Sequence, residues 1–467
     1  MKKKIATLLL LVLALTAWKN PVAKKYDVLI THANIVNVIT GKIQPNQFIA
    51  IAKGIIQQTG NMSTSKSITA LKIINVQNKY VMPGLWDNHV HFRGGEDLAQ
   101  ENKNFLPLYL AYGVTTVRDC GGDITNHLLQ WRKEITDGTL AGPTIFTSGP
   151  KLDGDKPAWA GSISVLNQKD VIKALDSLQS IPADFVKIYD GSITAEAYYA
   201  ILKEAAKRGM KTTGHMPLTA NILDAANFGL NGSEHLYYVL KSCSPKADSL
   251  SKLNMGYGMM SEIAESYDPA LAEKVYKQLA KKRFFVTPTL YIGQILAHVA
   301  TDDHSQDQLL PYIGKGIKAT YAGRVASAKR AAKSAAGDFH NKTEEVFGKM
   351  VKPMYDAGIN ILAGSDCGAF NSYTYPGEAI HGELKRLVKA GLTPAEALKT
   401  SFINGPKFFD KSAIYGSIAK GKIADLLILD ANPLVKIENI DQVNTVIAKG
   451  KVYPKNKLDK MLAAVKN

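Results

Sequence analysis

The middle of the chain alternates short apolar runs with segments of helical periodicity. Eight of these runs have the length and side-chain pattern of buried strands. They are Tyr80–Phe92, Val114–Cys120, Pro143–Gly149, Asp184–Tyr189, Lys211–His215, Gly232–Tyr238, Phe284–Tyr291 and Asn360–Asp366. Helical patterns such as 195–208 and 394–400 separate most of them. Because strand–helix alternation predicts a parallel sheet, the pattern indicates an α/β fold with a (β/α)8 barrel of the TIM type over residues 83–414.

Both ends of the chain share a different sequence pattern, in which polar residues separate short β-branched runs. The runs are 26–38, 48–51, 72–76, 424–429 and 443–448. A hairpin with its turn at Gly450 follows the last run. We therefore predict one small β-sandwich domain, which is built from residues 24–82 and 415–456 and is interrupted by the barrel.

Two long insertions, 241–282 and 293–348, are rich in Ala, Lys and Glu and have helical patterns. They are compatible with a surface cover for the barrel and equally with a lid over an active site.

The first residues have the pattern of a secretory signal peptide. Lys2, Lys3 and Lys4 precede an apolar run from Ile5 to Ala17, and small residues stand at Ala17 and Ala23. The run is shorter than the roughly 20 residues that span a bilayer. We expect residues 1–23 to direct export to a periplasm or the exterior, with no stable membrane anchor after cleavage. An uncleaved N-terminal anchor is the alternative.

The net charge of +16 does not alter the predicted fold or indicate a particular partner. The Lys residues are spread along helix-like segments and form no compact basic block with interleaved aromatic residues. This distribution indicates a solvated basic surface, and we expect no nucleic-acid partner. Three cysteines, Cys120, Cys243 and Cys367, provide neither a disulfide framework nor a Cys-x-x-Cys zinc site.

The strand ends carry the candidate chemistry, because reactive side chains of a (β/α)8 barrel gather there. His89 and His91 end the first strand. Residues i and i+2 of a strand point to the same side, so the two imidazoles can share one metal ion. A His-x-His pair alone is weak evidence, because it is common by chance.

Four further residues strengthen the case. Lys187 lies inside the fourth strand, whereas His215, His235 and Asp366 end the fifth, sixth and eighth. Each of them alone has an ordinary structural interpretation, such as a helix cap for Asp366. Their coincidence at separate strand ends favours a shared metal site. The remaining histidines do not fit the pattern, and we expect most of them, His340 included, at the surface and His381 in a structural role.

These residues lie in motifs that resemble the amidohydrolase superfamily, in particular its imidazolonepropionase-like and Xaa-Pro dipeptidase-like (prolidase-like) branch. The motifs are Pro-Gly-Leu-Trp-Asp-Asn-His-Val-His at 83–91, Phe-Val-Lys-Ile at 185–188, Gly-His-Met-Pro at 214–217, Glu-His at 234–235, Gly-Ser-Asp at 364–366 and the closing segment 416–426. The resemblance covers nearly the whole chain after the signal segment.

The resemblance implies a role for each residue. His89, His91 and Asp366 would hold a first metal ion, and His215 and His235 a second. Lys187 would bridge both ions as a lysine carboxylated by CO2. Only a neutral amine reacts with CO2, and burial beside positive charge depresses the pKa of a lysine, which is ordinarily about 10.4. The alternative is an ordinary lysine paired with an acid such as Asp190.

The implied enzyme is a metal-dependent amidohydrolase that cleaves a carbon–nitrogen bond in a small substrate, such as a dipeptide or an N-acyl amino acid, by a metal-activated hydroxide. Asp366 and His235 would be catalytic, with Asp366 moving the proton. One or two divalent ions are implied; the ligands suit zinc, and manganese, iron and cobalt are compatible.

The substrate contacts are less defined. Tyr237, Tyr238 and Tyr291 follow strand ends and could line a pocket or pack under a loop. Arg118 could meet a substrate carboxylate, although a salt bridge with a neighbouring acid is an equally direct use.

Several alternatives stay open. A lactonase, a phosphotriesterase or a deaminase could use the same centre, and a mononuclear enzyme of imidazolonepropionase type could lack the second ion. A non-catalytic binding protein on a barrel scaffold is the non-enzyme alternative. A homo-oligomer is compatible with the sequence.

Overall fold

The computed structural model describes residues 25–253, 255–332 and 339–466. The predicted signal segment, residues 1–23, lies outside the described residues. No helix among the described residues is both long and apolar enough to cross a membrane.

The two ends of the chain meet in one separate sheet, as expected. Its order is β19-β18-β17-β5-β1-β2-β3, and β4 pairs with β1 in parallel. The strands are β1 (Lys25–Asn37), β2 (Lys42–Ala52), β3 (Ile55–Asn61), β4 (Thr69–Asn75), β5 (Tyr80–Pro83), β17 (Leu426–Leu429), β18 (Val443–Ala448) and β19 (Lys451–Pro454). The predicted hairpin at Gly450 is confirmed, because β18 pairs antiparallel with β19.

The strands of the expected β-sandwich domain belong to one continuous sheet. Strand β17 pairs with β5, so the C-terminal strands continue the N-terminal sheet edge to edge. Successive residues of β1, Leu29 and Ile30, lie in two different clusters of buried side chains. Since neighbouring residues of a strand point to opposite faces, apolar side chains cover both faces of this single sheet.

The predicted first barrel strand, Tyr80–Phe92, divides between the two parts of the molecule. Residues before Gly84 belong to β5 in the terminal sheet, and β6 (Leu85–His91) begins the barrel. A Cβ at Gly84 would lie 2.3 Å from the Thr115 hydroxyl oxygen, so only glycine allows the chain to pass this close to β7 (Val114–Asp119).

The barrel strands are parallel, and neighbours follow one another in chain order except for β10, which lies at a sheet edge beside β9. They form three sheets, β16-β6-β7-β8, β10-β9-β11-β12 and β13-β14-β15. Their further members are β8 (Thr144–Thr147), β9 (Leu152–Asp153), β10 (Ile163–Ser164), β11 (Val186–Ile188), β12 (Thr212–Gly214), β13 (Gly232–Glu234), β14 (Phe285–Thr287), β15 (Asn360–Ile361) and β16 (Cys367–Gly368).

Single backbone hydrogen bonds link the three sheets into a ring. The N–H of Asp184 donates to the carbonyl of Thr147 at 2.8 Å, and that of Asn231 donates to Thr212 at 3.1 Å. The N–H of Asn88 donates to Ala363 at 3.0 Å, which connects the last unit to the first. The fold is therefore of the predicted TIM-barrel type, although the ladder between the sheets is not continuous.

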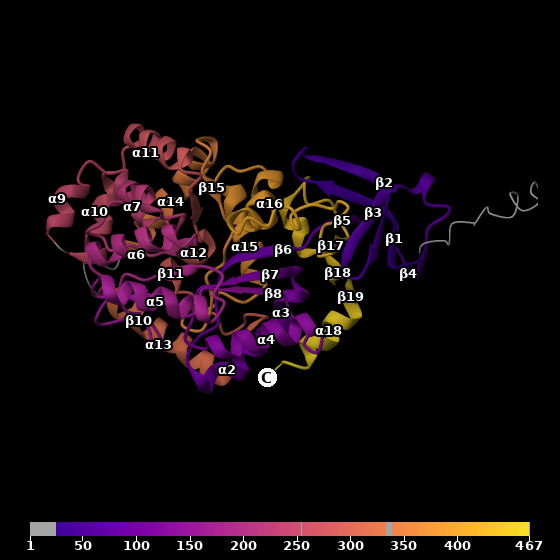
Figure 1. The fold of residues 1–467 in the computed structure, drawn as a ribbon, viewed down its shortest axis with the longest axis horizontal. Coiled ribbons are helices and arrows are strands. Elements are labelled where there is room, and N and C mark those ends of the chain that lie inside the picture. Colours follow the sequence, from indigo (N-terminus) through magenta and orange to yellow (C-terminus); the bar gives the residue numbers. More distant parts are fainter. Residues whose placement is uncertain (1–24, 254, 333–338, 467) are drawn as a thin grey trace, which may run out of the picture.

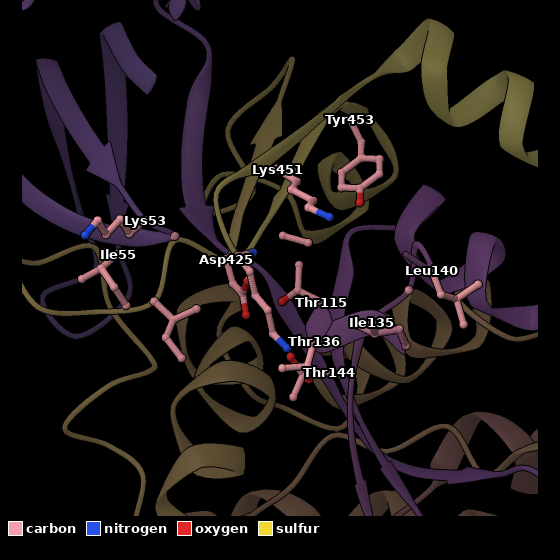
Figure 2. Close-up of a pocket in the computed structure, with 15 residues that line it drawn as sticks. Lys53, Ile55, Thr115, Ile135, Thr136, Leu140, Thr144, Asp425, Lys451 and Tyr453 are labelled. Carbon is pink, nitrogen blue, oxygen red and sulfur yellow. Dashed lines mark hydrogen bonds between the residues drawn. The ribbon is translucent and has the colours of Figure 1, made fainter. Parts of the chain in front are cut away.

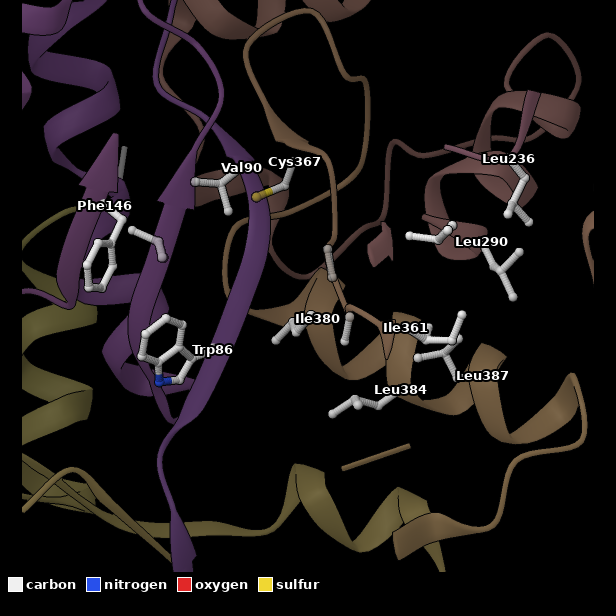
Figure 3. Packing of buried hydrophobic residues seen from close by; sticks show 14 of the residues in the cluster. Trp86, Val90, Phe146, Leu236, Leu290, Ile361, Cys367, Ile380, Leu384 and Leu387 are labelled. Atoms are coloured by element: carbon white, nitrogen blue, oxygen red, sulfur yellow. The ribbon is translucent and has the colours of Figure 1, made fainter. Parts of the chain in front are cut away.

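Helices surround the ring, and their apolar faces bury its strands. In α6 (Ala195–Lys207) the Thr194 side chain accepts the N–H of Ala197, which caps the helix. Its buried side chains, including Ile201 and Leu202, form one stripe at helical spacing. In α16 (Pro394–Phe402) Thr393 and Glu396 form a capping box. Figure 3 shows Trp86 and Val90 of β6, and Ile361 and Leu384 from the last unit, among the buried side chains of one hydrophobic cluster.

The other helices outside the two insertions are short or lie on the barrel surface. They are α2 (Ala99–Lys103), α3 (Phe105–Ala111), α4 (Thr125–Asp137), α5 (Gln168–Ser180), α7 (Ile222–Phe228), α15 (Glu378–Lys389), α17 (Asn404–Phe408) and α18 (Lys455–Ala463).

The insertions fold as helices, as predicted. They contain α8 (Tyr237–Ser242), α9 (Ala247–Lys252), the 3-10 turn η3 (Gly256–Met259), α10 (Met260–Glu265), α11 (Pro269–Lys281), α12 (Leu290–His298), α13 (Lys315–Ala331) and α14 (Phe339–Asp356). Figure 1 shows α9, α10 and α11 at the end of the molecule away from the terminal sheet.

Candidate metal centre

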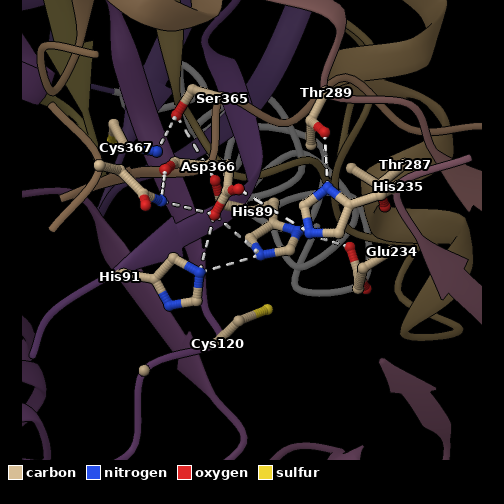
Figure 4. A network of polar contacts seen from close by, with 12 residues as sticks. His89, His91, Cys120, Glu234, His235, Thr287, Thr289, Ser365, Asp366 and Cys367 are labelled. Carbon is tan, nitrogen blue, oxygen red and sulfur yellow. Dashed lines mark hydrogen bonds and ion pairs between the residues drawn. The ribbon is translucent and has the colours of Figure 1, made fainter. Parts of the chain in front are cut away.

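His89 and His91 at the end of β6 converge on Asp366, which follows β15. The Nε2 atoms of the two histidines lie 3.2 Å apart. Asp366 Oδ1 lies 2.8 Å from Nε2 of His91 and 3.4 Å from Nε2 of His89. Figure 4 shows the three side chains directed toward one point. Two imidazoles and a carboxylate in this arrangement are a donor set that suits a divalent ion.

Asp366 and His235 occupy strained backbone positions. Asp366 has φ 57° and His235 has φ 61°, in the left-handed region that residues other than glycine rarely adopt. The N–H of Asp366 donates to His89 at 2.7 Å, and that of His235 donates to Thr287 at 2.8 Å. Backbone hydrogen bonds thus hold both turns, and strain of this kind is typical of functional sites.

His215 and His235 face each other across the same cavity, with ring centroids 4.9 Å apart. The Nδ1 atom of each ring lies within hydrogen-bond distance of an oxygen atom. Asp190 Oδ1 lies 3.0 Å from Nδ1 of His215, and Thr289 Oγ1 lies 2.7 Å from Nδ1 of His235. This arrangement leaves Nε2 of each imidazole for a ligand, and it is the usual outer hydrogen-bond pattern of metal-binding histidines.

Lys187 lies in the middle of β11, is 0% exposed, and its Nζ has no hydrogen-bond partner among the described residues. The alternative in which Lys187 pairs with Asp190 is not what the structure shows. Asp190 instead lies against His215 and accepts hydrogen bonds from Tyr238 and Tyr257. An unpartnered ammonium is costly at such a position. Conversion of the amine to an anion would complete the donor set around it.

The ionisation states agree with ligand roles. Burial, followed by nearby cations, lowers the pKa of His89 and of His91 well below the ordinary value. Burial also lowers the pKa of His235 to about 4. Burial alone would raise the pKa of Asp366, but His89 and His235 lower it below its ordinary value. Neutral imidazoles beside an ionised carboxylate are the forms that bind metal ions.

Arg118 requires a correction. It is 1% exposed, and its Nη2 donates to Glu234 Oε1 at 2.8 Å and to Thr287 Oγ1 at 3.1 Å. Glu234 in turn lies 2.7 Å from Nδ1 of His89. Arg118 therefore cannot reach a substrate carboxylate, and the salt-bridge alternative describes its position. The sequence did not predict the contact between Glu234 and His89.

The cluster opens into a cavity of about 240 Å³, and both insertions supply its walls. Tyr237 lines the cavity, as predicted. Tyr238 and Tyr291 do not: the Tyr238 hydroxyl donates to Asp190 at 3.0 Å, and that of Tyr291 donates to Glu378 at 3.3 Å. The lining residues that sequence reasoning did not select include Arg93, Trp159, Tyr189, Tyr257, Arg324, His340 and Phe347.

The expected surface position of His340 is thus wrong, whereas His381 is structural as expected, since its Nε2 lies 2.7 Å from the carbonyl oxygen of Tyr112. One of the missed residues had a usable signal, because Tyr189 stands two positions after Lys187 on the same strand end. The insertion residues had none, since helical periodicity does not tell which turn of a cover faces a cavity.

A second cavity, of about 330 Å³, lies between the terminal sheet and the beginnings of β7 and β8 (Figure 2). Asp425, Lys451 and Tyr453 line it, and the described residues around it include no histidine. Burial raises the pKa of Asp425 to about 6. Because it is at the amino ends of the strands, we assign this cavity to domain packing and not to catalysis.

In this TIM-type barrel the buried imidazoles and the carboxylate gather at the strand ends, where barrel enzymes carry their active sites. The model of the amidohydrolase family matches residues 80–453, and the chain belongs to this family. The predicted enzyme class, a hydrolase of amide-type bonds, is confirmed at this level.

The individual proteins to which the chain is similar have low sequence identity to it. Ochratoxinase of Aspergillus niger is 24% identical over 398 residues, which cover 78% of this chain and 73% of the relative. The crystal structure of a Xaa-Pro dipeptidase with bound methionine superposes with a TM-score of 0.66 at 19% identity, covering 91% of this chain and 99% of the other. A bottromycin amidohydrolase gives 0.71 at 18% identity, covering 94% and 90%. These two structures support the fold alone.

Proposed function

We propose that the protein is a metal-dependent hydrolase that cleaves the amide bond of a dipeptide or an N-acyl amino acid. The observation that carries the proposal is the convergence of His89, His91 and Asp366 beside Lys187, whose buried Nζ has no partner among the described residues.

The residues divide into two groups of ligands. His89, His91 and Asp366 would hold one ion, and His215 and His235 would hold a second. Lys187 would stand between them after its neutral Nζ forms a bond to the carbon of CO2 and releases a proton to solvent, which leaves a carbamate anion. Divalent ions such as zinc, when bound, lower the pKa of water and polarise a carbonyl group.

Asp366 is placed to move the proton in this reaction. Its carboxylate is ionised, Oδ1 lies 2.8 Å from His91 and Oδ2 lies 3.8 Å from His235. Asn371 donates a hydrogen bond to Oδ1 at 3.0 Å, which fixes the carboxylate plane. Asp366 would accept the proton of the attacking water and deliver it to the departing amine, so that the carboxylate is regenerated. His235 lies beside it, and its catalytic contribution would come through the ion that it holds.

The cavity walls favour a substrate that is partly apolar. Trp159, Tyr237 and Phe347 supply aromatic surface, and the helical insertions contribute part of the wall. A protein of similar structure, a Xaa-Pro dipeptidase with bound methionine, acts on dipeptides, which agrees with the proposed substrate class.

The test combines metal analysis with a substrate panel. Protein purified without chelator is analysed for bound metal, loaded with zinc or manganese, and assayed on Ala-Xaa dipeptides and N-acetyl-Xaa compounds in which Xaa is Phe, Leu, Met or Pro. Aryl esters, lactones, aryl phosphates and adenine serve as comparison substrates. Hydrolysis of an amide that is lost on chelation and restored by metal supports the proposal. Metal-loaded protein that cleaves only a lactone or phosphate, or that deaminates adenine, would contradict it.

A further inference from the structure

The cavity above the candidate metal centre is rich in positive charge. Asp366 is its single acidic member among the described residues that line it, and that carboxylate is engaged with His91. Arg93 and Arg324 line the same cavity. A binding site with this imbalance favours an anionic ligand.

The guanidinium of Arg93 is already hydrogen-bonded within the protein. Its Nε donates to the carbonyl of Ala369 at 2.8 Å, and its Nη2 donates to Asn371 Oδ1 at 3.0 Å. Its guanidinium also lies 4.1 Å from the centre of the Trp159 ring. Arg93 therefore acts as a fixed part of the wall.

Arg324 differs from Arg93. It lies on α13, in the second insertion, and is half-buried. Within the part of the chain that the structure describes, no acid or carbonyl group is paired with its guanidinium. Helix α13 carries four other basic residues, Lys315, Lys318, Lys329 and Arg330, and no acidic residue.

The charge of Arg324 acts inside the cavity. Burial and, after it, the positive charge of Arg324 lower the pKa of His340 to about 4. His340 is therefore neutral at pH 7, and Arg324 carries the free charge at this side of the cavity. A guanidinium presents two parallel N–H groups, which match the two oxygens of a carboxylate.

We propose that Arg324 is a specificity-determining residue that binds a carboxylate on the substrate, away from the bond that is cleaved. The aromatic side chains of Tyr237 and Phe347, with ring centroids 5.1 Å apart, would receive the apolar side chain of the same amino acid. This inference rests on the proposed function and assigns its substrate class: amides that end in a free carboxylate and carry an apolar side chain.

The kinetic test compares each hydrolysed dipeptide with its C-terminal carboxamide. In Arg324→Met we expect KM for the acid to rise about 10- to 100-fold, because one charge-assisted contact is lost, while kcat changes by less than about threefold. The carboxamide should be equally poor for the variant and the wild type. Arg324→Lys should recover part of the loss. Arg330→Met, an exposed residue of the same helix, is the matched control and should behave as the wild type.

A binding measurement separates this inference from the proposed function. The melting temperature of the zinc-loaded protein is measured with N-acetyl-phenylalanine and with its carboxamide. Greater stabilisation of the wild type by the acid, lost in Arg324→Met and kept in Arg330→Met, supports the carboxylate site whether or not turnover is seen. Equal stabilisation by acid and carboxamide, or an unchanged preference in Arg324→Met, overturns it. Absence of amide hydrolysis with this preference intact counts against the proposed function alone.

Discussion

The carboxylate of Glu234 lies 2.7 Å from Nδ1 of His89, and both side chains are fully buried. Arg118 pairs with the same carboxylate from the other side. Although burial raises the pKa of Glu234, the charge of Arg118 and the hydrogen bond with His89 hold it well below its ordinary value. The ionised carboxylate thus fixes the ring of His89 with Nε2 toward His91 and Asp366.

Replacement of Glu234 by Gln should therefore weaken metal binding. We expect about a 10- to 100-fold rise in the zinc Kd, measured by competition with a chromophoric chelator, because the outer partner of His89 loses its charge. Loss of the partner of Arg118 should also destabilise the fold by about 3–5 kcal/mol. Glu204→Gln removes a surface ion-pair carboxylate and is the control. An unchanged Kd in Glu234→Gln would show that His89 needs no such partner.

Lys187→Ala should lose metal while remaining folded. The control is Lys241→Ala, which removes another buried lysine whose Nζ donates to the carbonyl of Ala220 at 2.7 Å. The control should lose stability but keep its metal. Because the missing group in Lys187→Ala would be an anion, added acetate or propionate should restore part of the activity. Two tightly bound ions in Lys187→Ala, measured by elemental analysis, would exclude the bridging role.

Asp366→Asn should retain much of the metal, since the amide oxygen replaces one ligand atom. The amide cannot accept the proton of water, so kcat should fall by at least about 100-fold. Metal content and kcat are measured on the same zinc-loaded preparation, with the exposed Asp356→Asn as the control. A variant with full kcat would remove Asp366 from proton transfer.

Glu383 should make stability dependent on pH. Burial raises its pKa to about 8, while its Oε2 accepts the N–H of Tyr291 at 2.7 Å. An acid whose folded pKa exceeds its unfolded value contributes stability below the unfolded pKa, and that stability is lost as the pH rises through the folded pKa. Between pH 5 and pH 8 the wild type should therefore lose about 1–4 kcal/mol relative to Glu383→Gln. Denaturant unfolding of both proteins at the two pH values measures this difference. A constant difference would show that Glu383 does not titrate in this range.

The residues that meet at the candidate metal centre could be predicted because strand periodicity and barrel geometry act locally. The i, i+2 spacing of His89 and His91 fixes their common side, and the position of His215, His235 and Asp366 at strand ends fixes their common rim. Each inference needs only the strand that carries the residue and the rule that parallel strands end at one face.

The partners of those residues could not be predicted in the same way. For Arg118 the sequence left open a substrate carboxylate or a salt bridge, and the partner is Glu234, which lies more than a hundred positions away in sequence. Tyr238 follows Tyr237 directly, yet only Tyr237 lines the cavity, because α8 turns the next side chain toward Asp190.

The alternation of strands and helices and the strand-rich chain ends could be predicted from the amino-acid sequence, because local periodicity encodes them, and the ligand-type side chains could be read from their identity at strand ends. Only the tertiary structure decided that β17 joins β5 in a single sheet, that Lys187 is left without a partner among the described residues, and that Arg324 faces the cavity. These features depend on contacts between segments that are distant in the chain, and such contacts are set by packing and by the satisfaction of buried polar groups.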